Sequence, residues 1–448
     1  MSETEMRIPR RVLGTLLNSI GSGVVPRFGL EYIAIGRKSE IGALLGDLDF
    51  IQEGGSTFRF VVGRYGSGKS FLLQLIRGHC LERGFITADA DLTPERRLAG
   101  TKGQGLATYK ELISNLAAKA SPEGGALGTL IARWFSQLQM QLVADKGYEI
   151  GSPDMNKAMT QEILAISKSL EGMVSGFDFA VVLNAYYQAH CEGGEETKSN
   201  ALRWLRGEYT SRVQARTELG VNSVIDDTNW YSFIKLFAVF VRRIGYKGLV
   251  VFVDECVNLY KIPNRISREN NYEKILSMFN DTLQGKAEGL GLIFGGTPQF
   301  LEDARRGLYS YEALRSRLAD SRFIDGDAYV NFMGPIIRLE RLSDDEIFAL
   351  ISRVGKLHAQ FYSYERTATD GEILAFLKLC LSRAAADKLV TPREIIRDFL
   401  AVMGVLYQNP SATFEELLGT KEVVETLHTA GAKETGEGDD FTLEDMEF

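Results

Sequence analysis

Cysteine, histidine and long apolar runs are all scarce in this chain of 448 residues, and each scarcity excludes a class of protein. The four cysteines are scattered without the C-x-x-C spacing of zinc sites, and the four histidines complete no metal pattern. We therefore expect neither a zinc site nor disulfide bonds. No stretch approaches the roughly 18 uninterrupted apolar residues of a spanning helix, and no apolar segment follows the charged N-terminal residues. The expected location is the cytoplasm, with no membrane partner.

A basic charge balance is also lacking. The net charge is −8 and the isoelectric point is about 5.4, which argues against a generally basic nucleic-acid-binding coat but leaves room for a local basic face. Apolar residues make up 45% of the chain, which is ample for a core, and the length indicates two or three structural units.

What the chain does contain is a complete phosphate-binding loop of the pattern G-x-x-x-x-G-K-[ST]. Its residues are Gly63, Arg64, Tyr65, Gly66, Ser67, Gly68, Lys69 and Ser70. A strand-like run over 58–62 precedes it and a helix-like run over 71–81 follows, as the pattern requires. Glycines let several N–H groups face phosphate oxygens, while Lys69 supplies charge to the phosphates and Ser70 a hydroxyl to magnesium. This setting favours a nucleotide-binding protein over a glycine-rich turn that matches by chance.

Four further strand-like runs predict an α/β fold with a five-strand parallel sheet. They cover residues 85–89, 248–253, 290–294 and 336–339. Helical periodicity fills the long interval between the second and third strands. Helices are predicted there over 109–118, 127–142, 159–170, 177–190 and 200–219.

After the fifth strand the pattern is wholly helical. Ser343 and Glu346 form a capping box ahead of a helix over 347–357, and Thr391 with Glu394 marks a second helix start. The expected domains are an N-terminal helical segment (1–34), a nucleotide-binding core in two parts (35–93 and 228–340), a helical insertion (94–227), a helical lid domain (341–432) and a disordered acidic tail (433–448). The tail is interpreted as solubilising, with a short docking peptide as the alternative.

Acidic and hydroxyl side chains follow two of the predicted strands. Asp254 and Glu255 end the third strand at the sheet edge where ligands of parallel sheets bind. Asp254 is predicted to hold magnesium, and Glu255 to orient and polarise the water that attacks the γ-phosphate. Thr297, after the fourth strand, is a candidate for contacting that phosphate or water, although its Gly-Gly-Thr-Pro context is also simply a good turn.

Transfer of a phosphoryl group also needs positive charge, which an arginine commonly delivers in cis or from a neighbouring subunit. Arg305 and Arg306 qualify, and Arg315 and Arg317 are the preferred catalytic candidates because a predicted helix could carry them to an adjacent protomer. The alternative is an ordinary solvated face. Arg393, at the second helix start, is the candidate that reports nucleotide state to the helical domain.

These residues together resemble an AAA+ ATPase of the replication-initiator and signalling branch. The run of Ile35, Gly36 and Arg37 resembles its adenine-side motif, Lys69 its Walker A lysine, and Asp254 with Glu255 its Walker B pair. Thr297 and Arg393 resemble its two sensor residues. Shorter sequence segments, including residues 90–93, 201–208 and 306–311, resemble the ATP-binding proteins of BREX-type phage-defence loci, of the BrxD kind.

The resemblance implies ATP and Mg²⁺ as ligands, assembly into a homo-oligomer, and work beside a helicase or other defence proteins. The implied nucleotide-binding residues are Ile35, Gly36, Arg37, Gly63, Tyr65, Gly66, Ser67, Gly68, Lys69, Ser70, Phe71 and Arg393, with Ser70 and Asp254 as metal ligands. The initiator group carries a winged-helix DNA-binding domain, for which too little chain remains after residue 400.

Direct contact with DNA is therefore an alternative rather than an expectation. Its best candidates are Arg203, Arg206, Arg212 and Arg216, whose spacing would place them on one or two neighbouring helix faces. The hypothesis that the sequence favours is an ATPase that switches a nucleic-acid-processing partner in phage defence. A non-hydrolysing nucleotide-bound scaffold and a DNA-binding regulator are its competitors.

Overall fold

The computed structural model describes residues 8–169, 173, 175–319, 331–365, 368–384 and 391–419. The chain divides into two compact units. The first, called here the sheet unit, comprises Lys38–Arg64 and Ile76–Leu339. The second, the helical unit, comprises Met1–Arg37, Tyr65–Leu75 and Glu340–Phe448. The predicted acidic tail lies outside the described residues.

The sheet unit is built on five parallel strands in the order β2-β3-β4-β1-β5, counted over the described residues. The strands are β1 (Thr57–Gly63), β2 (Ile86–Asp91), β3 (Leu249–Asp254), β4 (Leu290–Gly296) and β5 (Ile336–Leu339). All five predicted strands are confirmed, and so is the parallel sheet. Because the strands are parallel, β1, β3 and β4 end at one edge of the sheet.

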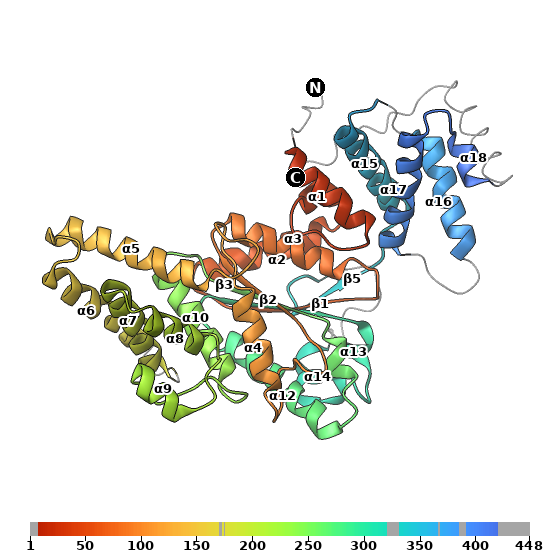
Figure 1. The fold of residues 1–448 in the computed structure, drawn as a ribbon. Helices are drawn as coiled ribbons and strands as arrows, with labels where there is room; N and C mark the ends of the chain where they lie inside the picture. The colour runs from red at the N-terminus through yellow and green to blue at the C-terminus, as the bar shows by residue number, and fades with distance from the viewer. Residues whose placement is uncertain are drawn as a thin grey trace. The chain divides into compact units, whose positions relative to one another are not determined.

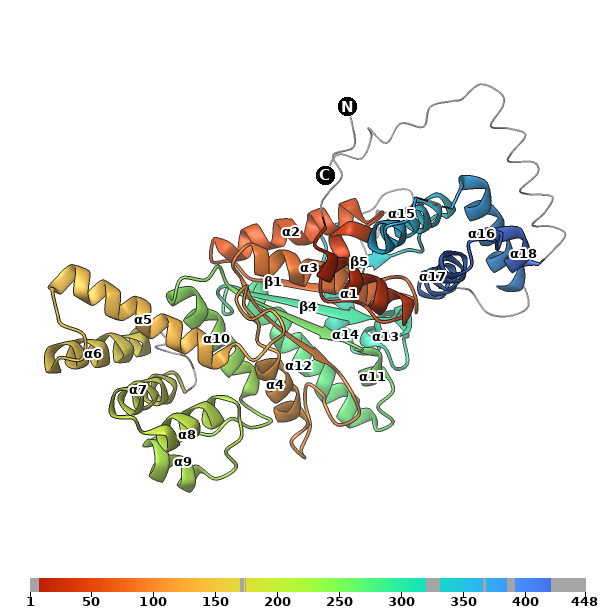
Figure 2. The same cartoon turned by 45° about the horizontal axis from the view of Figure 1, so that its top comes forward.

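Helices cover both faces of this sheet. Figures 1 and 2 place α2 (Lys38–Gln52) on one face and α10 (Trp230–Arg243) and α12 (Arg265–Leu283) on the other. On the second face, Phe58 of β1 stacks on Phe294 of β4 at a centroid distance of 4.9 Å and meets Phe279 of α12 edge-on at 5.5 Å. Burial on both faces explains why the strands read as continuous apolar runs.

Short helices connect the later strands. They are α11 (Val257–Tyr260), α13 (Pro298–Glu302), the 3-10 helix η2 (Leu308–Ser310) and α14 (Glu312–Leu318). Helix α3 (Lys69–Glu82) belongs to both units, since the division between them falls after Leu75.

The predicted insertion is helical and shares its core with the sheet unit. Its helices are α4 (Gln104–Ser114), α5 (Leu127–Lys146), α6 (Pro153–Ser169), α7 (Gly176–Glu192), α8 (Glu195–Leu205) and α9 (Arg212–Leu219). Aromatic side chains of α10 join the insertion to the sheet. Phe240 meets Trp134 of α5 at 5.4 Å, and Phe237 meets Phe179 of α7 at 5.3 Å. Helix α10 therefore packs on both the insertion and β3.

Two helix predictions in the insertion are wrong. The run over 200–219 is two helices, because the chain turns at Gly207, whose φ of +72° is left-handed and whose missing Cβ leaves room for Leu106 and Tyr109. The run over 109–118 starts earlier and stops at Ser114. Beyond it, Ala117 forms an antiparallel bridge with Thr87, next to β2.

The helical unit joins both ends of the chain in one core. Its elements are α1 (Arg10–Gly21), the 3-10 helix η1 (Leu30–Ile33), α15 (Asp344–Tyr362), α16 (Asp370–Ala384), α17 (Pro392–Gln408) and α18 (Phe414–Leu418). Helix α1 lies beside α15 and α17 (Figure 1). Its Leu13, Leu16 and Leu17 belong to the same buried core as residues of those two helices. Both predicted capping boxes, at Ser343 and Thr391, are confirmed. In the described part of the chain, no helix is both long and apolar enough to cross a membrane.

Candidate functional site

The phosphate-binding loop has the strand–loop–helix setting that the sequence predicted. Gly63 ends β1, and α3 begins at Lys69. Gly66 and Gly68 have left-handed φ angles of 79° and 86°, which L side chains rarely adopt. Within the loop, Ser67 is buried, and its Oγ has no hydrogen-bond partner among the described residues. A buried hydroxyl in this state is suited to a ligand that supplies an acceptor or a donor.

An aromatic ring lies beside the loop lysine. Tyr65 is 66% exposed, and the Nζ of Lys69 lies 5.5 Å from the centre of its ring. At that distance the ring face attracts the ammonium group. The contact keeps the lysine charge within the loop.

The predicted adenine-side motif is anchored to the same loop. Arg37 donates hydrogen bonds from Nη2 to the backbone oxygens of Ser67, at 3.3 Å, and Glu340. Gly36 has a φ of +70°, and a Cβ there would lie 2.3 Å from Oε1 of Glu346 in the first turn of α15. The motif therefore links the phosphate loop to the start of a C-terminal helix.

Two apolar side chains next to these motifs hold them to the helical unit. Ile35 and Phe71 are half-buried and pack against its core. Hydrophobic contact of this kind fixes both motifs on the same set of helices.

The start of α17 touches the loop directly. A Cβ on Gly66 would lie 2.3 Å from Cγ2 of Thr391, the N-cap residue of α17. Thr391 also accepts a hydrogen bond from the backbone N–H of Glu394 at 3.4 Å. Arg393, in the first turn of this helix, is exposed, and its Cδ lies near Gly23. The loop and the positive end of a helix are thus neighbours within one unit.

The predicted acidic pair lies at the carboxyl edge of the sheet. Asp254 ends β3, and its Oδ1 accepts a hydrogen bond of 2.8 Å from the backbone N–H of Glu255. Glu255 has a φ of +57°, which is strained for a residue with a side chain. Strain of this kind, about 1–3 kcal/mol, concentrates at functional sites.

Asp91 is a functional candidate that the sequence analysis missed. It ends β2 and is the register partner of Asp254 on β3, so the two side chains lie on the same face. Desolvation at the strand end, followed by repulsion from Asp254 and Glu255, raises the pKa of Asp91. The side chain of Asp91 nevertheless remains exposed to solvent. Its position directly after an apolar strand was the signal available in the sequence.

Thr297 follows β4 at the same edge of the sheet as the acidic pair, whereas the candidate arginines lie on later segments of the sheet unit. Thr297 is buried and caps α13, its Oγ1 accepting a hydrogen bond from the N–H of Phe300 at 3.3 Å. Arg315 and Arg317 are exposed on α14, where Arg317 donates to the backbone oxygen of Ala313 at 2.6 Å.

Two other arginines after this strand have different surroundings. Arg306 donates to the backbone oxygens of Tyr260 and Ile262 and stacks on the ring of Tyr260. Arg305 is exposed. Arg306 therefore has a structural role that accounts for its position.

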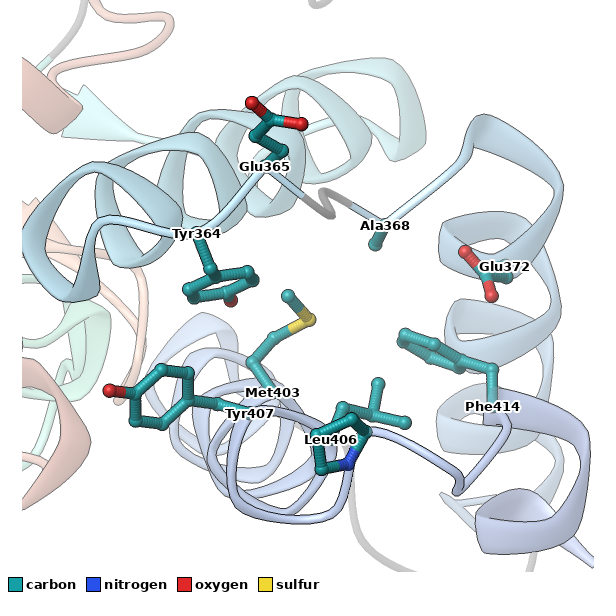
Figure 3. Close-up of a pocket in the computed structure, with 9 residues that line it drawn as sticks. Tyr364, Glu365, Ala368, Glu372, Met403, Leu406, Tyr407 and Phe414 are labelled. Carbon is teal, nitrogen blue, oxygen red and sulfur yellow. The ribbon is translucent and has the colours of Figure 1, made fainter.

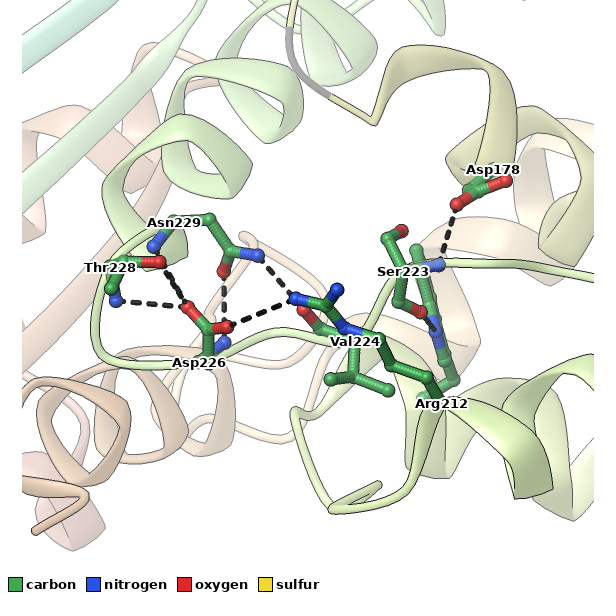
Figure 4. Close-up of polar contacts among 8 residues, drawn as sticks. Asp178, Arg212, Ser223, Val224, Asp226, Thr228 and Asn229 are labelled. Atoms are coloured by element: carbon green, nitrogen blue, oxygen red, sulfur yellow. Dashed lines mark hydrogen bonds and ion pairs between the residues drawn. The ribbon is translucent and has the colours of Figure 1, made fainter.

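The four arginines proposed for nucleic acid do not share one helix. Arg203 lies on α8, where it approaches Glu208 at 3.6 Å and stacks on the ring of Tyr209. Arg212 starts α9 and lies 4.0 Å from Asp226 (Figure 4). Arg206 and Arg216 are exposed. Two of the four are thus engaged within the insertion.

The partner of Arg212 belongs to a polar network at the end of the insertion. Asp226 accepts hydrogen bonds from Thr228 and Asn229 (Figure 4). Against the effect of partial burial, these bonds and Arg212 lower the pKa of Asp226. The charge that Arg212 faces is therefore a stable carboxylate.

Among the described residues, no group of three or more His, Cys, Asp or Glu side chains is arranged to hold a metal. Magnesium needs fewer protein ligands, because it keeps several waters and binds substrate phosphates. A hydroxyl at Ser70 and a carboxylate at Asp254 are oxygen donors of the kind it prefers. The mutual repulsion of Asp91, Asp254 and Glu255 would be relieved by a cation, so the residues fit the ion.

Comparison with known proteins gives one family. Residues 8–422 match the family described as BREX system ATP-binding protein BrxC/D. No curated protein matches the chain.

Proposed function

Because the chain belongs to the BREX system ATP-binding protein BrxC/D family of phage-defence proteins, we propose that it hydrolyses ATP with Mg²⁺ and uses the reaction to switch a partner. The partner proposed is a nucleic-acid-processing, helicase-like protein of the same defence system in the cytoplasm. The observation that carries the proposal is the phosphate-binding loop between β1 and α3, with Asp254 and Glu255 ending β3 of the same sheet.

Binding of ATP is assigned to the loop and its attachments. Backbone N–H groups and Lys69 would receive the phosphates, and Arg37 fixes the loop from outside through Ser67. Ser70 and Asp254 would hold Mg²⁺, which neutralises charge on the β- and γ-phosphates. Ile35, Gly36, Tyr65 and Phe71 complete the proposed contacts to the nucleotide.

Hydrolysis is assigned to Glu255. A carboxylate in this position would orient water and accept its proton, a role that contributes about 10²–10⁴-fold to rate. The strained backbone of Glu255 supports the assignment, since a solubilising acid has no need of a left-handed conformation. Thr297, Arg315 and Arg317 are proposed as further contributors, the arginines from a neighbouring copy in an AAA+ type homo-oligomer.

The switch is assigned to the contact between Gly66 and Thr391. A phosphate that moves the loop would also move the first turn of α17, since the two are already in van der Waals contact. Arg393 in that turn is the residue proposed to sense the nucleotide. The C-terminal helices would then act as the lid domain that reports nucleotide state.

The test is ATP turnover as a function of protein concentration, with sizing in parallel. We expect turnover to rise with assembly and to fall at least 100-fold in Glu255→Gln and Lys69→Ala, while the matched control Glu149→Gln, an exposed acid in the insertion, keeps wild-type turnover. Glu255→Gln is expected to retain ATP binding and Lys69→Ala to lose it. Tight binding without turnover under any condition would favour the non-hydrolysing scaffold.

The arginines are tested by mixing. If Arg317 acts from a neighbouring copy, Arg317→Ala and Lys69→Ala proteins are each inactive alone, and their mixture recovers part of the turnover. A mixture of Arg315→Ala and Lys69→Ala proteins tests Arg315 in the same way. Recovery in neither mixture excludes a finger in trans on α14.

The DNA-binding alternative has its own measurement. It expects salt-dependent retention on DNA that weakens when the two exposed arginines Arg206 and Arg216 are changed to Ala. Retention that is unchanged in this variant, or absent in wild type at low salt, removes the alternative.

A further inference from the structure

The segment after the acidic pair is tied to the neighbouring strand by one side chain. Helix α11 begins two residues after Glu255, and its second residue, Asn258, donates a hydrogen bond of 2.7 Å from Nδ2 to the backbone oxygen of Leu92. Leu92 directly follows β2 and is buried. Its own N–H donates to the backbone oxygen of Asp254 at 3.0 Å. Both polar backbone groups of Leu92 are therefore bonded to the segment that carries the acidic pair.

The direction of the Glu255 side chain is set by its backbone. The side chain is exposed, so no surrounding core orients it. Its φ of +57° is a conformation that persists in an L residue only when neighbouring structure holds it there. Before the turn, the N–H of Glu255 donates to Oδ1 of Asp254 at 2.8 Å. After it, the N–H of Cys256 donates to the backbone oxygen of Gly295 at 3.1 Å, and the N–H of Asn258 closes the turn on the backbone oxygen of Glu255 at 2.9 Å.

The far end of α11 is held by an arginine. Arg306 donates from Nη2 to the backbone oxygens of Tyr260 and Ile262, both at 3.2 Å. Its guanidinium carbon also lies 5.3 Å from the centre of the Tyr260 ring. The short helix is therefore a fixed support. From this support, the side chain of Asn258 attaches the turn at Glu255 to the end of β2.

Satisfying a buried carbonyl is the simplest role for Asn258. Loss of the bond would leave the backbone oxygen of Leu92 without a partner, which destabilises any fold. The bond lies within one turn of a strained residue, however, and strain is released where its supports are removed. Relaxation of Glu255 to an ordinary right-handed conformation would turn its carboxylate in another direction. The phosphate loop would be unaffected, because it is a different segment of the chain.

We propose that Asn258 is a positioning residue for Glu255. By its bond to Leu92 it keeps the backbone of Glu255 left-handed, and this conformation directs the carboxylate that acts in hydrolysis. The inference rests on the proposed role of Glu255. Asn258 itself is assigned no contact with nucleotide or metal, so its loss should slow turnover and leave ATP binding intact.

The first measurement compares turnover with binding in the full chain. Asn258→Leu, which removes the donor at similar volume, should lower kcat about tenfold or more, because a misplaced catalytic group is costly. Its affinity for a non-hydrolysable ATP analogue should stay within about twofold of wild type. Asn264→Leu is the matched control, since Asn264 accepts a hydrogen bond from the N–H of Ser267 at 2.9 Å within α12, and it should keep wild-type kcat.

The second measurement needs no nucleotide. Glu255→Gly should raise the urea midpoint of the wild-type chain, because glycine adopts a left-handed conformation without strain. In the Asn258→Leu background the same change should raise the midpoint by less than about half as much, since the strain is already released. Phe414→Leu is the destabilised control background. Phe414 is buried in the core of the helical unit, where it lines a pocket (Figure 3), and there Glu255→Gly should act as in wild type.

The two measurements separate failure of this inference from failure of the proposed hydrolysis. If wild type has no turnover, the hydrolysis proposal fails and the urea comparison still tests Asn258. Equal midpoint gains from Glu255→Gly with and without Asn258 would overturn the inference. So would wild-type kcat in Asn258→Leu, or a loss of analogue binding as large as the loss of kcat. Asn258→Gln, which keeps a donor, should give intermediate values in both measurements, so the test does not depend on the fold of the leucine variant.

Discussion

At the scale of single residues, conformation and charge at a few positions decide what the site can do. Gly66 combines a left-handed φ with a close neighbour, and Glu255 accepts a conformation that most residues avoid. Asp91 lies opposite Asp254 across two strands. The close neighbour of Gly66 and the register partner of Asp91 lie on other segments of the chain, so residue type alone does not specify these contacts.

Gly66→Ala should destabilise the nucleotide-free helical unit more than Gly68→Ala does. Both substitutions carry the cost of a left-handed alanine, about 1–2 kcal/mol. Only a Cβ at Gly66 would also collide with Thr391, at 2.3 Å, whereas no other segment in the described part of the chain comes within 4 Å of a Cβ at Gly68. Urea unfolding of the two variants without nucleotide measures the difference. Equal losses would mean that the start of α17 does not constrain the loop.

Asp91→Asn should stabilise the protein slightly when Mg²⁺ and nucleotide are absent. The change removes one of the charges that repel each other at the sheet edge, and because the residue is exposed, solvent screening limits the gain to a few tenths of a kcal/mol. Denaturation in EDTA measures it, with Asp145→Asn on α5 as control. A loss of stability would show that Asp91 makes favourable contacts there instead.

At the scale of elements, buried polar contacts decide how helices lie on the sheet. Arg77 of α3 is almost completely buried, and it donates to Asp89 of β2 at 3.0 Å and to the backbone oxygen of Pro122 at 2.7 Å. Such a charge is costly to bury and is retained only with its partners. It connects the second half of the helix that follows the phosphate loop to the neighbouring strand.

Asp89→Asn should destabilise the protein by about 3–5 kcal/mol, because it removes a carboxylate that pairs with the buried guanidinium of Arg77. The double variant Arg77→Met with Asp89→Asn should recover most of this loss, since it also removes the buried positive charge and keeps a similar volume. Chemical unfolding of both variants checks the prediction. If the double variant is no more stable than the single one, hydrogen bonding rather than charge dominates this contact.

Helix starts were predictable from the sequence, whereas two helix ends were not. The capping boxes at Ser343 and Thr391 are local, because cap and third helical residue lie within one turn. The breaks after Ser114 and at Gly207 depend on distant partners, Thr87 for the first and Tyr109 for the second. The helical periodicity of apolar residues does not encode such contacts, so the prediction based on it extended both helices too far.

At the scale of the whole molecule, the helical unit draws residues from the beginning, the loop and the end of the chain. Helix α1 shares a core with α15 and α17, and Ile35 and Phe71 join it from the nucleotide motifs. A change of stability in this unit therefore reaches the loop through packing. His358, buried in α15 beside Tyr362 and Tyr364, is its most informative titratable group.

The helical unit should lose stability as the pH falls from about 6.5 to about 4. Burial lowers the pKa of His358 from its ordinary value to about 4, so the unfolded chain binds a proton in this window and the folded chain does not. Each pKa unit corresponds to about 1.4 kcal/mol, so between pH 7.0 and 5.0 we expect a loss on the order of 2 kcal/mol. Urea unfolding at pH 7.0 and 5.0 measures it. His358→Gln should reduce the dependence, and an unchanged slope would assign it to carboxylates.

The sequence by itself determined the strands, the phosphate loop, the acidic pair and the helix caps. Each of these features depends on residues that are close together in the chain. The burial of a strand, the backbone freedom of a glycine-rich loop and the capping of a helix are all local requirements. The same short sequence motifs indicated the family, and the family match over residues 8–422 confirms it.

Only the tertiary structure decided which of these segments meet. It brought Thr391 against Gly66, set Asp91 opposite Asp254 and placed α1 in the core of the C-terminal helices. It also engaged Arg203 and Arg212 within the insertion. These contacts join residues far apart in the chain, and their free energy comes from packing and charge in three dimensions, which residue patterns along the sequence do not specify.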